Sequence, residues 1–268
     1  MIPAEARVAF WEQTGGKNPL GTYETVQDAI TYGRSSPHSG IAQPPYDAAC
    51  MDERILGNKH TIRAGGAGAF SETTRAGLRV IAHQIAVFRS HHGCGKASKY
   101  AEANGHPTEP DAVNALAVRE AAALATELSA QHKQSRMQPP PIHIAIGIVL
   151  DATPYGINPA TMKSRTGQPL LPPMLTISGG VLGAGTAEED GPLAGAVATG
   201  KNSLGEFFTP DAPLLVAVVF DSSQHTSKLT PDNAHDIAQR ITHNHPEIPM
   251  EIQTVDMNAR PSTRTIIT

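Results

Sequence analysis

Short runs of apolar residues alternate with longer amphipathic stretches over most of the chain. The runs at residues 142–151 and 214–221 are almost continuously apolar, which is typical of strands buried on both faces of a parallel sheet. The last run alternates apolar and polar residues instead, which predicts a strand that is buried on one face. The predicted strands are residues 46–50, 60–63, 85–90, 142–151, 214–221 and 250–256.

Apolar residues at helical spacing fill much of the chain between these strands. The Thr230-Pro231 pair is a strong helix start, because threonine can cap a helix and proline suits its first turn. The predicted helices are residues 25–31, 73–84, 96–105, 112–133 and 231–243. The repeated order of strand, helix and strand predicts an α/β fold with a central, mainly parallel β-sheet flanked by helices.

The domain organisation follows from where this regular pattern fails. A chain of 268 residues is long enough to bury a large core, and we predict a single domain. Residues 1–43 are poorly periodic and form an N-terminal arm, whereas residues 44–156 form the core that holds both cysteines. Residues 157–213 are rich in glycine and proline and form a long insertion, which could be a lid, an oligomer contact or a mobile excursion. Residues 214–268 are a C-terminal extension of strand, helix and strand.

Composition narrows the class of protein. The formal charge of −4 provides no basic surface for nucleic acid, and no uncharged apolar stretch reaches the roughly 18 residues of a membrane span. The N-terminus lacks a basic start followed by an apolar stretch, which argues against a secretory signal. We therefore expect a cytoplasmic protein without a nucleic-acid or membrane partner. In that compartment two cysteines indicate metal ligands rather than a disulfide.

Both cysteines lie in short polar motifs that follow predicted strands. Cys50 begins the motif Cys50-x-Asp52-x-Arg54, and Cys94 ends the motif His91-x-x-Cys94. Because the carboxyl ends of parallel strands meet at one edge of a sheet, we expect the two motifs to lie close together. Two thiolates and one imidazole are three zinc ligands, and a catalytic zinc site keeps its fourth position open for water. The residues therefore predict an open zinc site.

The paired motifs, with the glycine-rich turn at residues 65–68 between them, resemble the pattern of the β-class carbonic anhydrases over residues 50–95. A fainter likeness is to the carboxysomal shell carbonic anhydrases, a divergent branch of the same superfamily. The β-class family usually has Arg-Asn-Ala-Gly where this chain has Arg63-Ala64-Gly65-Gly66. The resemblance implies a β-carbonic-anhydrase-like fold and a homodimer or higher homo-oligomer. The fainter likeness adds a bacterial microcompartment as an alternative location.

The resemblance also implies the reaction and the role of each residue. Zn²⁺ would be held by Cys50, His91 and Cys94, and metal-bound hydroxide would hydrate carbon dioxide reversibly to bicarbonate and a proton. Asp52 would accept the hydrogen bond of the hydroxide, while Arg54 would keep Asp52 ionised and away from the metal. Two residues apart in an extended segment, these side chains point the same way, which favours a bidentate ion pair. In some members this pair opens and the aspartate closes the site, and the sequence leaves both states open for this chain.

The histidine ligand is open between three residues. His91 has the family spacing and follows a predicted strand, so we favour it. His83 lies eleven residues before Cys94, a spacing that resembles the carboxysomal branch, but it falls in a predicted helix. His92 is adjacent to His91 and should point away from the site.

Two other functions compete with carbon dioxide hydration. The same metal site could hydrolyse carbon disulfide or carbonyl sulfide. Alternatively, the chain could be a non-catalytic, carbonic-anhydrase-like zinc-binding protein that binds a partner. The Asp52–Arg54 motif argues against the second alternative, because a purely structural zinc site has no need of an acid held beside the metal. Carbon dioxide and bicarbonate are therefore the expected small-molecule partners.

Overall fold

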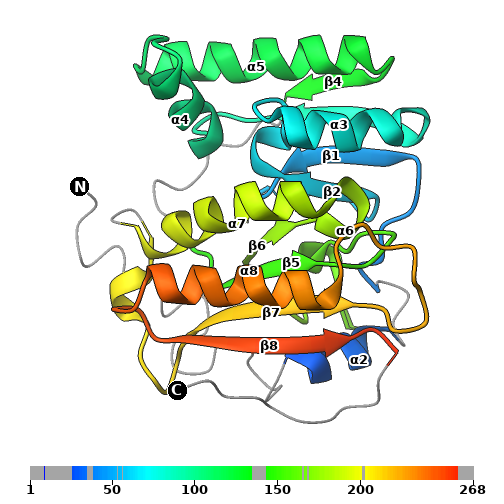
Figure 1. The fold of residues 1–268 in the computed structure, drawn as a ribbon, viewed down its shortest axis with the longest axis vertical. Coiled ribbons are helices and arrows are strands. Elements are labelled where there is room, and N and C mark those ends of the chain that lie inside the picture. The colour runs from blue at the N-terminus through cyan, green and yellow to red at the C-terminus, as the bar shows by residue number, and fades with distance from the viewer. Residues whose placement is uncertain are drawn as a thin grey trace.

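The computed structural model describes Ala9 and residues 26–34, 39–52, 54–55, 57–134, 143–164, 166–167, 169–200 and 203–258. In these residues the chain forms two four-stranded sheets, and every strand pairing in both sheets is parallel. Helices flank the sheets (Figure 1). The predicted α/β class with parallel sheet pairing is therefore confirmed.

The first sheet is built from the region that holds both cysteines. Its strand order is β2-β1-β3-β4, with β1 Tyr46–Cys50, β2 Thr61–Ala64, β3 Ile85–Ser90 and β4 Gln131–Gln134. Its 3-10 turns and helices are η1 Gly65–Gly68, α3 Glu72–Val80, η2 Ala82–Gln84, α4 Gly95–Ala103 and α5 Pro110–Glu127. Ser71 caps α3, because its side chain accepts a hydrogen bond from the backbone N–H of Thr74.

The second sheet repeats the strand order of the first. Its order is β6-β5-β7-β8, with β5 Gly147–Asp151, β6 Met174–Ile177, β7 Leu214–Phe220 and β8 Met250–Asp256. Its helices are α6 Gly179–Leu182, α7 Ala184–Thr199 and α8 Pro231–Asn244, and the earlier helix α2 Val26–Arg34 packs against β8. In each sheet the first strand along the chain lies between the second and the third. Asp151 is the last residue of β5, the position that Cys50 occupies in the equivalent strand β1 of the first sheet. Both cysteines of the chain belong to the first sheet region.

The two sheets meet along strands β2 and β6 (Figure 1). The backbone N–H of Ser178, just after β6, donates to the carbonyl of Arg63 at 2.8 Å, and the N–H of Arg63 donates to Ser178 Oγ at 3.0 Å. The N–H of Thr176 donates to the carbonyl of Met51 at 3.1 Å. These bonds hold the second sheet directly beside the loop that follows Cys50.

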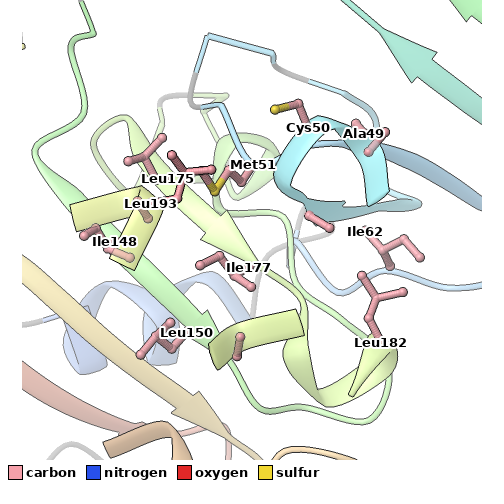
Figure 2. Packing of buried hydrophobic residues seen from close by; sticks show 14 of the residues in the cluster. Ala49, Cys50, Met51, Ile62, Ile148, Leu150, Leu175, Ile177, Leu182 and Leu193 are labelled. Carbon is pink, nitrogen blue, oxygen red and sulfur yellow. The ribbon is translucent and has the colours of Figure 1, made fainter. Parts of the chain in front are cut away.

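A shared apolar core reinforces this junction. Figure 2 shows buried side chains of β1, β2, β5 and β6 in one cluster with Leu182 of α6 and Leu193 of α7. A separate cluster on the opposite face of the second sheet combines Val26 and Ile30 of α2 with apolar residues of β5 and β7. Both faces of the second sheet are therefore covered, which explains why β5 and β7 are continuous apolar runs.

The junction includes a close approach of two backbones at Gly77 in α3. A Cβ atom at this position would lie 1.9 Å from the carbonyl oxygen of Leu182, so only glycine fits without a shift of backbone. We expect Gly77→Ala to lower the free energy of unfolding by about 2 kcal/mol, as overpacking does, although alanine favours helix. Urea unfolding would measure this loss, and Val80→Ala on the exposed side of the same helix should change stability by less than about 0.5 kcal/mol. Equal stability of the two variants would contradict the close packing.

Three expectations from the pattern need correction. The helix expected over residues 112–133 ends at Glu127, and residues 131–134 form strand β4 at the edge of the first sheet. Strand β8 is buried on both faces rather than one, because Gln253 on its polar side accepts a hydrogen bond from the N–H of Val26 at 2.7 Å. Residues 157–213, to which the pattern assigned no element, contain β6, α6 and α7. The predicted single domain and its division remain predictions.

Candidate metal centre

The first sheet brings together the three residues that the motifs predict as metal ligands. Cys50 ends β1, His91 follows β3, and Cys94 precedes the first residue of α4. One ligand atom from each lies within 4.8 Å of the other two. All three are buried, with 4%, 2% and 2% of their surface exposed. The arrangement could hold one metal ion, and the combination of two sulfurs and one imidazole suits zinc.

His91 is oriented as a metal-binding histidine would be. Its Nδ1 lies 2.8 Å from the backbone carbonyl of His92, which fixes the proton on Nδ1 and leaves Nε2 free to accept. Nε2 is buried and has no hydrogen-bond partner. A buried nitrogen without a partner is costly, and a metal ion between it and the two cysteine sulfurs would satisfy it.

The structure places the two alternative histidines elsewhere. His83 lies in η2, where its exposed ring contacts Gln84. His92 is exposed, and its Nε2 lies 2.5 Å from Nε2 of Gln134 on β4. His91 is the histidine that lies beside Cys50 and Cys94.

The two thiols are electrostatically coupled. A hydrogen bond from Cys94 lowers the pKa of Cys50 well below its usual value, against the opposing effect of burial, and the positive charge that His91 can carry adds to the lowering. Burial disfavours a protonated His91, but the interactions with Cys50, with Asp52 and with the backbone of His92 together outweigh burial and raise the pKa of His91. The pair of thiols thus gives up one proton readily in the metal-free protein. A bound dication would favour loss of the second proton as well.

The glycine-rich turn forms one wall of the cluster. The backbone N–H of Gly66 donates to Cys50 Sγ at 3.3 Å. Gly66 has a φ of 58°, and a Cβ at this position would lie 2.5 Å from the ring of Phe70. A side chain at this position would collide with Phe70 and strain the backbone, which explains the glycine here. The N–H of Gly66 would still donate to the sulfur of Cys50 when that thiolate binds a metal.

Asp52 and Arg54 form the predicted bidentate ion pair. Arg54 Nε donates to Asp52 Oδ1 at 2.8 Å, and Arg54 Nη2 donates to Asp52 Oδ2 at 2.5 Å. Each side chain is 6% exposed. Nε2 of His143, in the segment before β5, lies 3.3 Å from Arg54 Nη2. Arg54 therefore holds the carboxylate of Asp52 two residues after Cys50. The same guanidinium contacts the imidazole of His143, from the second half of the chain.

The ion pair makes a prediction about acid stability. Burial opposes ionisation of Asp52, but the hydrogen bonds and charge of Arg54, aided by His143 and His91, lower its pKa from 3.8 to about 2. Because this pKa is lower in the folded chain, ionised Asp52 stabilises the fold above about pH 4, and this stabilisation is lost as the pH falls towards 2. The shift corresponds to about 2 kcal/mol.

Urea unfolding of the metal-free protein at several pH values would measure this contribution. The stability difference between the wild type and Asp52→Asn should shrink by about 2 kcal/mol between pH 6 and pH 2, because asparagine does not titrate. Other carboxylates are common to both proteins and cancel in the comparison. A difference that does not vary with pH would show that the ion pair does not control the charge of Asp52.

Arg63 organises the loop that carries Asp52, a role that no sequence motif indicated. Arg63 on β2 is 2% exposed. Its guanidinium donates to the carbonyls of Cys50 at 3.0 Å and Asp52 at 3.2 Å, to the carbonyl of Ile55, and to Asn158 Oδ1 at 3.1 Å. The sequence feature that could have revealed this role is a charged residue inside a short predicted strand, because a buried arginine must find several hydrogen-bond acceptors.

Comparisons with protein-family models, with curated proteins and with solved structures find no match to this chain. Among the residues that the structure describes, no helix combines the length and apolar character needed to cross a membrane.

Proposed function

We propose that the chain is a zinc enzyme that catalyses reversible hydration of carbon dioxide to bicarbonate and a proton. The observation that carries the proposal is the buried Nε2 of His91, which lacks a hydrogen-bond partner and lies beside the sulfurs of Cys50 and Cys94. The Asp52–Arg54 ion pair next to this cluster adds an ionised carboxylate, which a purely structural metal site does not need.

The residues fit zinc by number, type and orientation. Cys50, His91 and Cys94 would hold the ion, and the backbone of His92 fixes the ring of His91 with Nε2 as the ligand atom. Three protein ligands leave a fourth position, which is the mark of catalytic rather than structural zinc sites. When bound, zinc supplies water that ionises near neutral pH.

The chain's own residues would orient the reacting water at this fourth position and accept its hydrogen bond. Asp52 stays ionised at neutral pH because Arg54 holds it, so it can accept a hydrogen bond from the reacting water. Arg54 uses its donors on both carboxylate oxygens, which keeps Asp52 from turning to the metal. The imidazole of His143 lies beside Arg54 and contributes to the low pKa of Asp52.

Stopped-flow measurement of carbon dioxide hydration with a pH indicator tests the proposal. Zinc-loaded protein would be compared with the Cys94→Ala variant between pH 6.5 and pH 9. We expect a rate that requires Cys94 and rises with pH, because thiolate ligands and an ionised water are both favoured at high pH. Zinc content would be measured on the same samples.

A protein with one bound zinc and no hydration rate at any of these pH values would contradict the proposal. A rate that persists in Cys94→Ala would place catalysis away from this cluster. Chelator competition should also show that zinc binds more weakly as the pH falls, because protons compete for both sulfurs.

A further inference from the structure

The second sheet region contributes a buried carboxylate to the walls of the metal centre. Asp190 lies on α7, is 1% exposed, and reaches across the junction between the sheets. Its Oδ2 accepts a hydrogen bond from the backbone N–H of Gly65 at 2.6 Å, and its Oδ1 lies 3.0 Å from Nζ of Lys96. A Cβ at Gly65 would lie 2.6 Å from Oδ1 of Asp190, so glycine at 65 permits this approach.

Both partners of Asp190 are adjacent to the thiols. Gly65 immediately precedes Gly66, whose N–H points at Cys50 Sγ. Lys96 lies two residues after Cys94, in the first turn of α4. One carboxylate from the second sheet region therefore contacts both the glycine turn that donates to Cys50 Sγ and the start of the helix that follows Cys94.

Comparison with the neighbouring Glu189 shows that the contact with Gly65 is the one specific to Asp190. Glu189 also binds Lys96, and its Oε2 accepts from Ser71 Oγ at 2.5 Å, but it is partly exposed and, among the described residues, it does not contact the backbone of the glycine turn. An ion pair at the surface contributes little, whereas a buried carboxylate that accepts a backbone N–H fixes the position of that backbone.

We propose that Asp190 is a positioning residue for the metal centre, which holds Gly65 so that the glycine turn and the sulfur of Cys50 are preorganised to bind metal. The inference rests on the metal site of the proposed function but not on its reaction. Its central element is the acceptor for the Gly65 N–H. The ion pair with Lys96 is the second contact.

The test compares two double variants that differ only in this acceptor. Lys96→Met removes the cation in both, so that no buried charge is left unpaired. Asp190→Asn keeps an oxygen that can accept from Gly65, whereas Asp190→Leu has nearly the same shape and no acceptor. The zinc dissociation constant of each, measured by chelator competition at fixed pH, should be about tenfold higher for the leucine variant, as for other groups that orient metal ligands.

Two further readouts separate positioning from general stability. Cobalt substituted for zinc should give the same thiolate-to-metal absorption bands in the asparagine variant and the wild type, and altered bands in the leucine variant. Glu189→Gln, the matched surface control on the same helix, should leave the zinc dissociation constant within about twofold. Equal zinc affinities and cobalt spectra in the two double variants would overturn the inference, even if the wild type hydrates carbon dioxide.

A measurement on the wild type covers the case in which the leucine variant does not fold. Hydrogen exchange of the Gly65 amide in the metal-free protein should be as slow as that of the core strands, because the amide is buried and bonded to a carboxylate. Fast exchange at Gly65 in a folded protein would overturn the inference. Absence of zinc binding in the wild type would overturn both this inference and the proposed function, whereas zinc binding without hydration would overturn only the function.

Discussion

Replacing Asp52 with asparagine should lower the rate of carbon dioxide hydration about a hundredfold while zinc stays bound. A positioned acid or base typically contributes about 10²–10⁴-fold to a rate. Asparagine keeps the shape of the side chain but cannot hold the negative charge that Arg54 stabilises in the wild type. Stopped-flow hydration rates and zinc content, measured on the same preparations, would give both quantities.

Asp47→Asn is the matched control for this prediction. Asp47 is a buried carboxylate on the same strand, β1, and it is ion-paired with Arg89 through Oδ2 at 2.5 Å. It lies three residues, or roughly 10 Å, before Cys50 in an extended strand, so its loss should leave the rate per bound zinc nearly unchanged. A full rate in Asp52→Asn would remove Asp52 from the mechanism. Loss of zinc from that variant would mean that Asp52 acts through metal binding.

Replacing Arg63 with methionine should cause the largest loss of stability among these variants, about 4 kcal/mol. The guanidinium donates to three backbone carbonyls in the segment from Cys50 to Ile55 and to the side chain of Asn158. Methionine would fill much of the volume but leave those buried acceptors without a donor. Denaturant unfolding would give the change in free energy, and zinc affinity should fall with it because the same segment carries Cys50.

Arg79→Met is the control for the loss of an arginine. Arg79 is an exposed residue of α3 that pairs with Glu72 and Glu127 at the surface. Exposed ion pairs contribute little, so we expect almost no change in stability or in zinc affinity. If Arg63→Met were as stable as Arg79→Met, the hydrogen bonds of Arg63 would not organise the loop after Cys50.

Several features of this fold could be predicted because they depend on local pattern. Strands β1, β3 and β8 have the predicted bounds, because short, largely apolar runs indicate the first two and an alternation of apolar and polar residues indicates the third. The grouping of Cys50, His91 and Cys94 followed from parallel strands that end at one edge of a sheet. The metal itself, the reaction and the homo-oligomer remain predictions.

The features that escaped prediction depend on contacts between distant parts of the chain. Strand β4 is polar and mostly exposed, so Gln131–Gln134 carries no apolar signal and was assigned to the preceding helix. Helix α7 contains Pro192 and several glycines, which mask it in a pattern-based analysis. Asp190 contacts a glycine 125 residues earlier, and no local rule links those two positions.

The division of the strands into two successive sets has a consequence for the order of folding. Strands β1–β4 all precede β5, so the first sheet can form while the second half of the chain is still being synthesised. Asp190 follows Cys94 by 96 residues, so the glycine turn beside Cys50 and the helix start after Cys94 would lack this carboxylate until α7 docks on them. We therefore expect high-affinity zinc uptake to come late in biogenesis, after both sheets have joined.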